Sequence, residues 1–264
     1  MSLATPISRA AICLAGWLGL LPGLDRAWAE PSAGAGEFAA HLKQNFHEAQ
    51  ARHQSAPADA DAAWKFGRAC FDLADIATNK TQRAAFAEPG IAACQQAISR
   101  QSNSAPAHYY LGMNLGQLAQ TKGLSALRLV SRMEREFARA RDLDEGLDWA
   151  GPDRNLGLLY RDAPALASVG SRRKARKHLE QAVKLAPQYP ENRLNLIEAY
   201  VKWGELQNAR RELAALDQAW PGARTNLVGV AWTGSWADWE SRLNKLRKKI
   251  GASPKPLGAP HQKN

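Results

Sequence analysis

The glycines Gly67, Gly112 and Gly157 stand at matching places in the segments KFGRAC, YYLGMNL and NLGLLY, at intervals of 45 residues. Each glycine comes directly after a large apolar residue, within a stretch whose apolar residues keep helical spacing. A residue without a side chain lets the backbones of two helices approach closely. The three glycines therefore predict a chain of repeated helix pairs.

The downstream part of the chain repeats with a shorter period of 34 residues. In HLEQAVKLAPQYPENRL, residues 178–194, Pro187 ends one expected helix and Pro190 begins the next. The 34-residue shift superimposes Ala175 on Ala209, Leu179 on Leu213, Ala182 on Leu216 and Pro187 on Pro221. Small residues on the second helices are expected to face the partner helix, namely Ala140, Ala175, Ala182 and Ala209.

These patterns predict an all-α solenoid of about four elongated helical hairpins in residues 59–220. A linker and an N-terminal helix are expected in residues 30–58, with the helix from Glu37 to about His53. Residues 221–251 are expected to form a C-terminal capping segment whose helix begins at Ser235, as N-cap, and ends at Gly251. The Pro- and Gly-rich residues 252–264 are expected to be disordered.

The upstream units are longer than the 34-residue period. The extra residues are expected to lie between the two helices of a unit, in TNKTQRAAFAEP, AQTKGLSALRLVS and RDAPALASVGS. Insertions at equivalent places line one rim of a solenoid, where binding loops are often found.

The helix pairs resemble tetratricopeptide repeats from about residue 60 to residue 221. The segments AHYYLGMNLGQLAQTKG, GPDRNLGLLY and PENRL are similar to the T component of tripartite ATP-independent periplasmic (TRAP) transporters. This resemblance implies a periplasmic helical-repeat protein that pairs with the solute-binding subunit of a transporter. Some members of that family are lipoproteins and some form oligomers, whereas this chain has no lipobox around Cys13.

Residues 1–29 have the pattern of a secretory signal. Arg9 lies in a basic start, an apolar run follows from Ala10 to Leu24, and the sequence AWA ends in a small residue at Ala29. The run is shorter than the ~20 apolar residues that a transmembrane helix needs. We expect cleavage after Ala29 and a periplasmic protein, with an uncleaved anchor as the alternative.

The chain carries a formal net charge of +10, of which about +9 remains after cleavage because residues 1–29 hold two arginines and one aspartate. An exported basic protein rarely meets nucleic acid, so we expect anionic solutes, acidic proteins or an anionic envelope surface instead. The basic runs SRRKARKH, residues 171–178, and RLNKLRKK, residues 242–249, are interpreted as solvated outer faces. Docking of an acidic surface or of lipid head groups is the alternative.

The concave face of a solenoid is the expected binding groove. Aromatic rings beside guanidinium groups suit a partly apolar ligand with a carboxylate, or the acidic end of a peptide. We expect Arg154→Ala and Arg161→Ala to weaken binding with little effect on thermal stability. The alternative is that Trp64, Phe71 and Leu158 pack against an N-terminal helix that fills the groove. The predicted groove residues are Trp64, Arg68, Phe71, Tyr109, Met113, Arg154, Leu158, Arg161, Leu194, Glu198 and Lys202.

Two cysteines remain after cleavage, in a compartment that permits disulfides. Cys70 and Cys94 both fall at the seam of one hairpin, so a bridge within the repeat and a pair of buried free thiols are both open. The three histidines at positions 41, 47 and 53 do not converge into a metal site. The acidic segment DLDEGLDWAGPD, residues 142–153, lacks the glycine and glutamate positions of a calcium loop and is interpreted as a solvated turn.

The sequence shows no nucleophile elbow, no phosphate-binding glycine loop and no paired catalytic carboxylates, so neither an enzyme nor a cofactor is expected. The leading interpretation is a periplasmic scaffold that binds a protein partner, with the solute-binding subunit of a TRAP-type transporter as the candidate. The alternative is a binding protein for an anionic or amphipathic small molecule in the groove. Homo-oligomerisation stays open.

Overall fold

The computed structural model of the chain describes residues 33–123, 126–164 and 168–251. This part of the chain is all-helical and contains ten helices and no strand. The expected signal, residues 1–29, and the expected disordered tail, residues 252–264, lie outside it. The helices are α1 (Ala33–Ser55), α2 (Ala60–Asp75), α3 (Lys80–Arg100), α4 (Ala105–Ala119), α5 (Ala126–Leu143), α6 (Leu147–Asp162), α7 (Arg172–Leu185), α8 (Pro190–Lys202), α9 (Leu206–Asn226) and α10 (Val230–Gly251).

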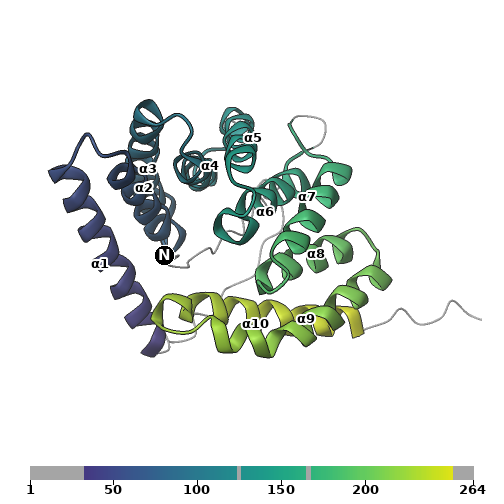
Figure 1. The fold of residues 1–264 in the computed structure, drawn as a ribbon. Helices are drawn as coiled ribbons and strands as arrows, with labels where there is room; N and C mark the ends of the chain where they lie inside the picture. The colour runs from purple at the N-terminus through teal and green to yellow at the C-terminus, as the bar shows by residue number, and fades with distance from the viewer. Residues whose placement is uncertain (1–32, 124–125, 165–167, 252–264) are drawn as a thin grey trace, which may run out of the picture.

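Helices α2 to α9 form four successive hairpins that stack into a curved array (Figure 1). Each hairpin pairs an even-numbered helix with the odd-numbered helix that follows it, and neighbouring even-numbered helices also contact one another. The even-numbered helices α2, α4, α6 and α8 therefore line the inner, concave side. This arrangement is the predicted solenoid of four hairpins.

Local capping signals fix several helix starts. Asp59 accepts a hydrogen bond from the backbone N–H of Asp61 at 2.8 Å, and Asn79 accepts one from Gln82 at 2.8 Å. Pro190 occupies the first turn of α8, where its missing N–H costs no helical hydrogen bond. These starts follow from short sequence patterns.

The three glycines of the repeat lie where the helices of a hairpin approach most closely. A Cβ atom added to Gly112 would lie 2.6 Å from Phe137 Cε1, and one added to Gly157 would lie 2.6 Å from Leu179 Cγ. At Gly67 it would meet Cys94 Sγ. In each case the obstructing side chain belongs to the second helix of the same hairpin. The small residues of the second helices are fully buried as well, namely Ala140, Ala175, Ala182 and Ala209.

The extra length of the upstream units goes mostly into helices, so the expectation of long rim loops is wrong for the first two units. Helix α3 begins at Lys80 and includes most of TNKTQRAAFAEP, and α5 begins at Ala126. Helix α6 ends at Asp162 and α7 begins at Arg172, and residues 165–167 between them lie outside the described part of the chain. Longer helices bury more apolar surface against their neighbours, and this burial stabilises the hairpins.

The last two helices differ from the sequence prediction. Pro221 lies inside α9 and does not end it, and α10 begins at Val230. Ser235 is a buried residue within α10 and not its N-cap. The expected apolar face of this helix is present, with Trp236, Trp239, Leu243, Leu246 and Ile250 buried together with Trp232.

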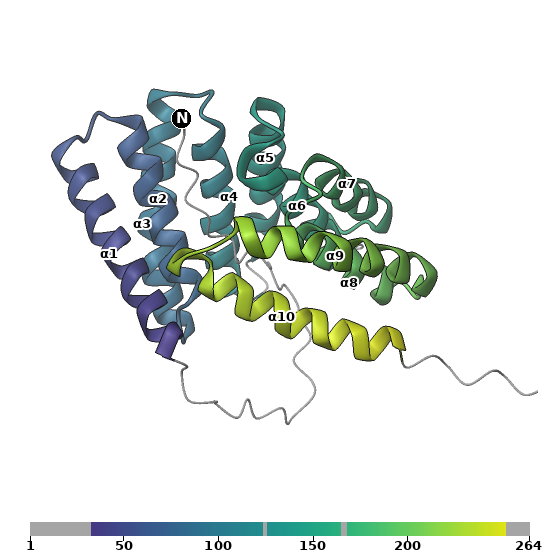
Figure 2. The same ribbon diagram turned by 60° about the horizontal axis from the view of Figure 1, so that its bottom comes forward.

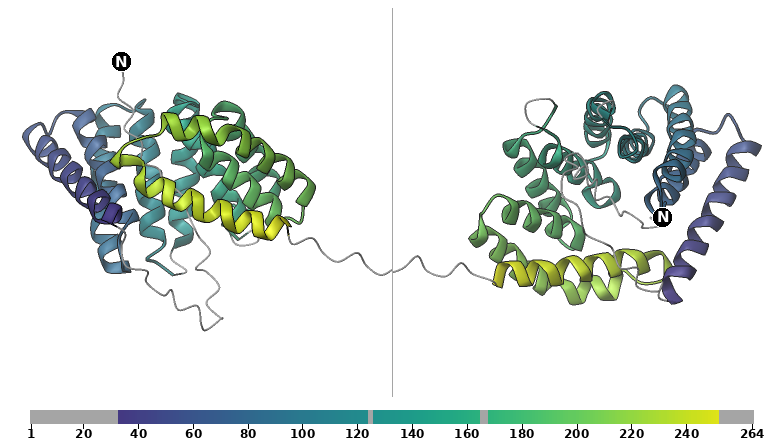
Figure 3. Two further views of the ribbon diagram at one scale, coloured as in Figure 1. Left: turned by 90° about the horizontal axis from the view of Figure 1, so that it is seen from below. Right: turned by 180° about the vertical axis from the view of Figure 1, so that it is seen from behind.

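Helix α10 crosses the open side of the array and closes it into a ring. It packs on α8 and α9, and its first residues meet α1, which flanks α2 at the other end of the stack (Figures 2 and 3). Phe38 and Leu42 of α1 are buried in one apolar cluster with Leu73 of α2, against which Ala231 packs. The C-terminal helix therefore contacts both ends of the solenoid. Within the described ranges, no helix is both long and apolar enough to cross a bilayer.

Candidate functional site

Most of the predicted groove residues are buried between neighbouring inner helices. Phe71, Tyr109, Met113, Leu158 and Leu194 are each at most 2% exposed. They pack in the two large apolar clusters that join successive hairpins. The prediction that these five side chains line an accessible groove is wrong, because they are buried within the apolar clusters of the core. The partner of Trp64 is not α1 but Tyr110 of α4, whose ring stacks on the indole at a centroid distance of 6.0 Å.

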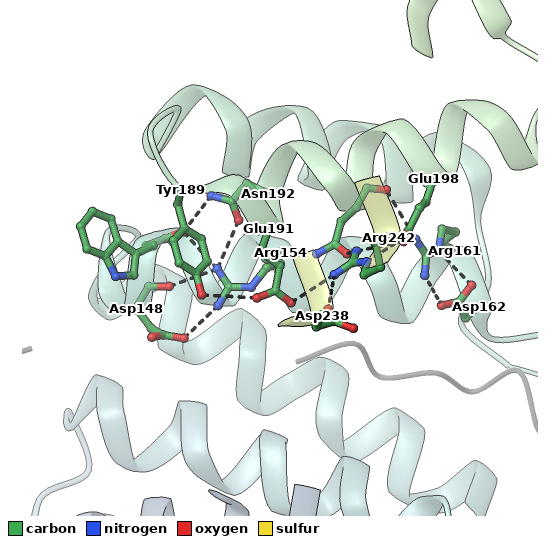
Figure 4. A network of polar contacts seen from close by, with 12 residues as sticks. Asp148, Arg154, Arg161, Asp162, Tyr189, Glu191, Asn192, Glu198, Asp238 and Arg242 are labelled. Atoms are coloured by element: carbon green, nitrogen blue, oxygen red, sulfur yellow. Dashed lines mark hydrogen bonds and ion pairs between the residues drawn. The ribbon is translucent and has the colours of Figure 1, made fainter. Parts of the chain in front are cut away.

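Arg154 is a structural residue at the centre of the inner face. Its side chain is 0% exposed, and it donates to the Asp148 carboxylate at 2.8 Å and to the backbone carbonyls of Asp148 and Trp149 at 3.1 and 3.2 Å. It also donates to Asn192 Oδ1 of α8 at 3.2 Å and stacks over the Tyr189 ring (Figure 4). Removing a buried ion-pair partner costs about 3–5 kcal/mol. The expectation that Arg154→Ala leaves stability unchanged is therefore wrong.

The carbonyls that bind Arg154 come from a left-handed turn at the start of α6. Asp148, Trp149 and Ala150 have φ values of 51°, 58° and 61°, which are costly for residues that carry a Cβ. Tyr109 donates a hydrogen bond to Asp148 Oδ2 at 2.7 Å, and Trp149 stacks on Tyr189 with ring centroids 5.6 Å apart. The segment DLDEGLDWAGPD is thus not a solvated turn throughout, because Asp148 is an internal anchor of the fold.

Helix α10 supplies an arginine that the sequence analysis assigned to a solvated face. Arg242 donates to both carboxylate oxygens of Glu198 on α8, at 2.7 and 3.0 Å, and to Asp238 at 3.3 Å (Figure 4). Arg161 pairs with Asp162 at 2.8 Å and lies 3.6 Å from the same Glu198. The charged residues predicted for this part of the groove therefore bind one another and Arg242, so α10 occupies this half of the concave face.

Below this network lies a buried carboxyl group, that of Glu191. Burial raises the pKa of Glu191 to about 7, against the opposing effects of Arg154 and Arg242. Arg242 Nη1 lies 3.9 Å from Glu191 Oε1, which is beyond hydrogen-bond distance. The carboxyl group is thus partly neutral at neutral pH. Lys202, at the end of α8, is the exposed member of the predicted groove and binds Asp162 at 3.1 Å.

The N-terminal end of the concave face holds a pocket of about 410 Å³ between α1, α2 and the first turn of α10. Two of the predicted groove residues, Trp64 and Arg68, are among its walls. Both residues come from α2, which forms one wall of the pocket. The wall from α1 was missed, since nothing in the sequence says which side of that helix faces α2. The α1 wall consists of His41, Asn45, Glu48, Ala49 and Arg52.

Trp64, Arg68 and Asp72 follow one another at intervals of four residues along α2 and therefore lie on the same face of the helix. Arg68 Nε lies 3.9 Å from Asp72 Oδ2, and the guanidinium stacks over the Tyr110 ring at 5.7 Å. Burial raises the pKa of Asp72 to about 7, and the neighbouring Arg68 opposes this effect. The pocket thus combines an aromatic wall, cations and one deeply placed carboxyl group.

The basic run at the start of α7 is exposed along most of its length. Arg172 and Arg176 pair with Glu205 and stack over the Trp203 ring, and Lys174 lies over Tyr160. The contacts of Arg172 and Arg176 join the outer helix to the next repeat, whereas the contact of Lys174 with Tyr160 lies within the α6–α7 hairpin. The second run is exposed except for Arg242 and Leu243 and Leu246 of the apolar face.

The two thiols of the first hairpin are free and buried, so the bridge within the repeat is not formed. The Cys94 thiol fills the space beside Gly67, whereas Gly90 faces the Asn114 side chain and the Cβ atom of Cys70. Burial raises the pKa of Cys70 to about 12 and that of Cys94 still further. Across the described ranges, no group of histidine, cysteine and carboxylate side chains has the arrangement of a metal site.

A curved stack of helical hairpins with a concave face closed by a capping helix is a helical-repeat solenoid, and its fold resembles that of tetratricopeptide-repeat proteins. Residues 166–224 match the family model of the tetratricopeptide repeat, and residues 35–144 match the model described as regulator of microtubule dynamics protein 1-3. No curated protein sequence matches the chain.

Several solved structures are similar to the chain at low sequence identity. TTC0263, a thermophilic tetratricopeptide protein of Thermus thermophilus, is 19% identical with a TM-score of 0.58, covering 82% of this chain and 96% of its own. YrrB, a repeat protein with an unusual peptide-binding site, is 17% identical with a TM-score of 0.43, covering 78% and 90%. MamA is 14% identical with a TM-score of 0.42, covering 85% and 100%. The likeness to TTC0263 concerns the fold alone.

Proposed function

We propose that this chain is a non-enzymatic scaffold that binds a protein partner at the N-terminal end of its concave face. The carrying observation is the pocket beside Trp64 and Arg68, where two predicted groove residues line an opening. The opposite half of the concave face is occupied by Arg242 and its partners. An aromatic ring beside cations suits an acidic side chain or the carboxyl terminus of a partner.

The compartment and the partner are part of the same proposal. The signal pattern in residues 1–29 supports export to the periplasm, with a mature chain that begins at Glu30. The similarity of GPDRNLGLLY and PENRL to the TRAP-transporter T component supports the solute-binding subunit of such a transporter as the partner. Sequencing the N-terminus of the protein recovered from a periplasmic fraction tests the export step.

The partner is tested by capture of a tagged full-length chain from its native envelope fraction, followed by light scattering to measure stoichiometry. We expect one partner protein in a fixed ratio, which is lost with Trp64→Ala and with Arg68→Ala. Arg173→Ala is the matched control, because Arg173 is an exposed arginine on the outer helix α7. A partner that stays bound to the Trp64 and Arg68 variants would overturn the assigned site, and the absence of any stoichiometric partner would overturn the scaffold.

A further inference from the structure

The pocket between α1 and α2 contains a carboxylate that the scaffold proposal does not use. Asp72 is 5% exposed, and in the described part of the chain its Oδ1 atom has no hydrogen-bond partner. Its other oxygen faces Arg68 at 3.9 Å, which is too long for a hydrogen bond. A buried carboxylate oxygen without a donor is costly, so a ligand that brings a donor stabilises the site. A positively charged ammonium group is the strongest such donor.

The mouth of the same pocket carries the opposite charge. Arg52 and Lys65 line it with side chains that are 65% and 45% exposed. Their acidic partners, Asp59 and Asp61, lie at 4.0 and 3.7 Å, and exposed pairs of this length contribute little. Both cations can therefore turn to an incoming carboxylate at small cost.

The rest of the lining combines polar side chains, among them Arg68 beside Asp72 and Glu48 on α1, with apolar groups. The indole of Trp64 and the methyl groups of Ala49, Ala62 and Ala69 are among these apolar groups. A volume of about 410 Å³ lies within the range of roughly 300–1,000 Å³ that is usual for small-molecule pockets. The pocket thus combines a buried acceptor, an aromatic ring with neighbouring methyl groups, and two exposed cations.

We propose that this pocket binds a small zwitterion of the amino-acid type, a free amino acid or dipeptide, whose ammonium group donates to Asp72 and whose carboxylate is held by Arg52 and Lys65. The ligand body lies against Trp64. This inference goes beyond the scaffold function and does not depend on a protein partner, because the recognising groups all belong to one pocket of this chain.

The pH dependence follows from the carboxyl group. The pKa of Asp72 is raised to about 7, and only its ionised form accepts from an ammonium group, so affinity rises as the pH increases through about 7. Binding at lower pH displaces a proton from Asp72. The other ionisable groups that face it are Arg68 and Asp75 on α2, Asp148 on α6, Lys65 at the mouth, and His41, Glu48 and Arg52 on α1.

The test is isothermal titration calorimetry of the full chain with free amino acids that have apolar, acidic and basic side chains, and with glycyl-phenylalanine. Each binder is compared with its N-acetyl and methyl-ester derivatives. We expect each derivative to lose at least about tenfold in affinity, because one charge-assisted contact is removed. Binding that survives N-acetylation would overturn the role of Asp72. The absence of binding by every free amino acid and dipeptide at millimolar concentration would overturn the proposal.

Asp72→Asn separates a ligand role from a structural one. The amide keeps the shape but loses the charge, so we expect at least about a tenfold loss of affinity together with an unchanged or higher unfolding temperature. Asp75→Asn is the matched control, because Asp75 lies on the same helix, binds Gln117 and does not line the pocket. Equal affinity of the Asp72 variant and the wild type would contradict the proposal, whatever the capture experiment shows.

Discussion

Arg242 of α10 donates two hydrogen bonds to Glu198 of α8, at 2.7 and 3.0 Å, and so attaches the C-terminal helix to the concave face of the repeat array. From the sequence, Glu198 was predicted to line the groove, and Arg242 was assigned to a solvated basic run of the C-terminal segment. The pair explains why half of the predicted groove is closed. Substitution of Arg242 therefore tests whether this contact attaches α10 to the repeat array.

Arg242→Ala should lower the free energy of unfolding by about 3 kcal/mol, because Glu198 loses its partner and Glu191 a nearby cation inside the fold. Urea unfolding followed by circular dichroism measures this. Arg247→Ala is the control, since its pair with Asp217 is exposed and should change stability by less than about 1 kcal/mol. Equal effects of the two variants would show that Arg242 does not attach α10.

Gly157→Ala should destabilise the protein by about 1–3 kcal/mol, because the new methyl group would lie 2.6 Å from Leu179 Cγ and 3.0 Å from its backbone nitrogen. Gly222→Ala is the opposite control. Gly222 lies inside α9 with open space around it, so alanine there should stabilise by about 0.5–1 kcal/mol. Thermal unfolding of both variants decides the point. A neutral Gly157→Ala would contradict close approach of the hairpin helices.

The sequence predicted the glycine contacts because they are local to one hairpin. Gly157 and Leu179 lie on consecutive helices, and the spacing of small residues alone indicates which faces meet. The same reasoning placed Trp64 and Arg68 at an opening. It also gave the apolar face of α10, since Trp236, Trp239 and Leu243 share one helical face.

The errors have a common physical origin in contacts between elements distant in the sequence. Arg242 sits in a basic run, and its partner Glu198 is 44 residues away, so no pattern marks it as internal. In the sequence, Asp148 is one of several acidic residues in a polar segment. Only the fold shows that it binds Arg154 and Tyr109 inside the protein. The 34-residue period superimposes Pro187, which lies beyond the end of α7, on Pro221, which lies within α9.

Stability should depend on pH through the two buried carboxyl groups. The pKa values of Asp72 and Glu191 are raised to about 7 in the folded state, above 3.8 and 4.5. The folded state therefore binds more protons than the unfolded state in this window. Their contribution to stability is fully present below about pH 4 and is lost as the pH rises to about 7.

Comparison of the wild type with the Asp72→Asn and Glu191→Gln double variant isolates this contribution. We expect the stability difference in favour of the variant to grow between pH 4.5, the ordinary pKa of a glutamate, and about pH 7. The unfolding midpoint in urea, measured at several pH values in that range, gives the difference. A constant difference across the range would mean that neither carboxyl group titrates there.

The two cysteines should react only after unfolding. Both thiols are buried, and burial raises their pKa values, so the reactive thiolate is scarce in the folded protein. Mass spectrometry after iodoacetamide treatment should show no adduct on the native chain and two adducts on the denatured chain without reductant. A requirement for reductant would indicate a bridge between Cys70 and Cys94.

The most direct test of the account measures hydrogen–deuterium exchange of the full chain alone and in complex with its captured partner. The account predicts new protection in residues 41–52 and 62–72, which form the two helical walls of the pocket, and little change along α8 and α10. Protection along α8 and α10, with none in α1 and α2, would contradict it. That result would mean that Arg242 leaves Glu198 when the partner binds and that the partner occupies the half of the groove that α10 covers.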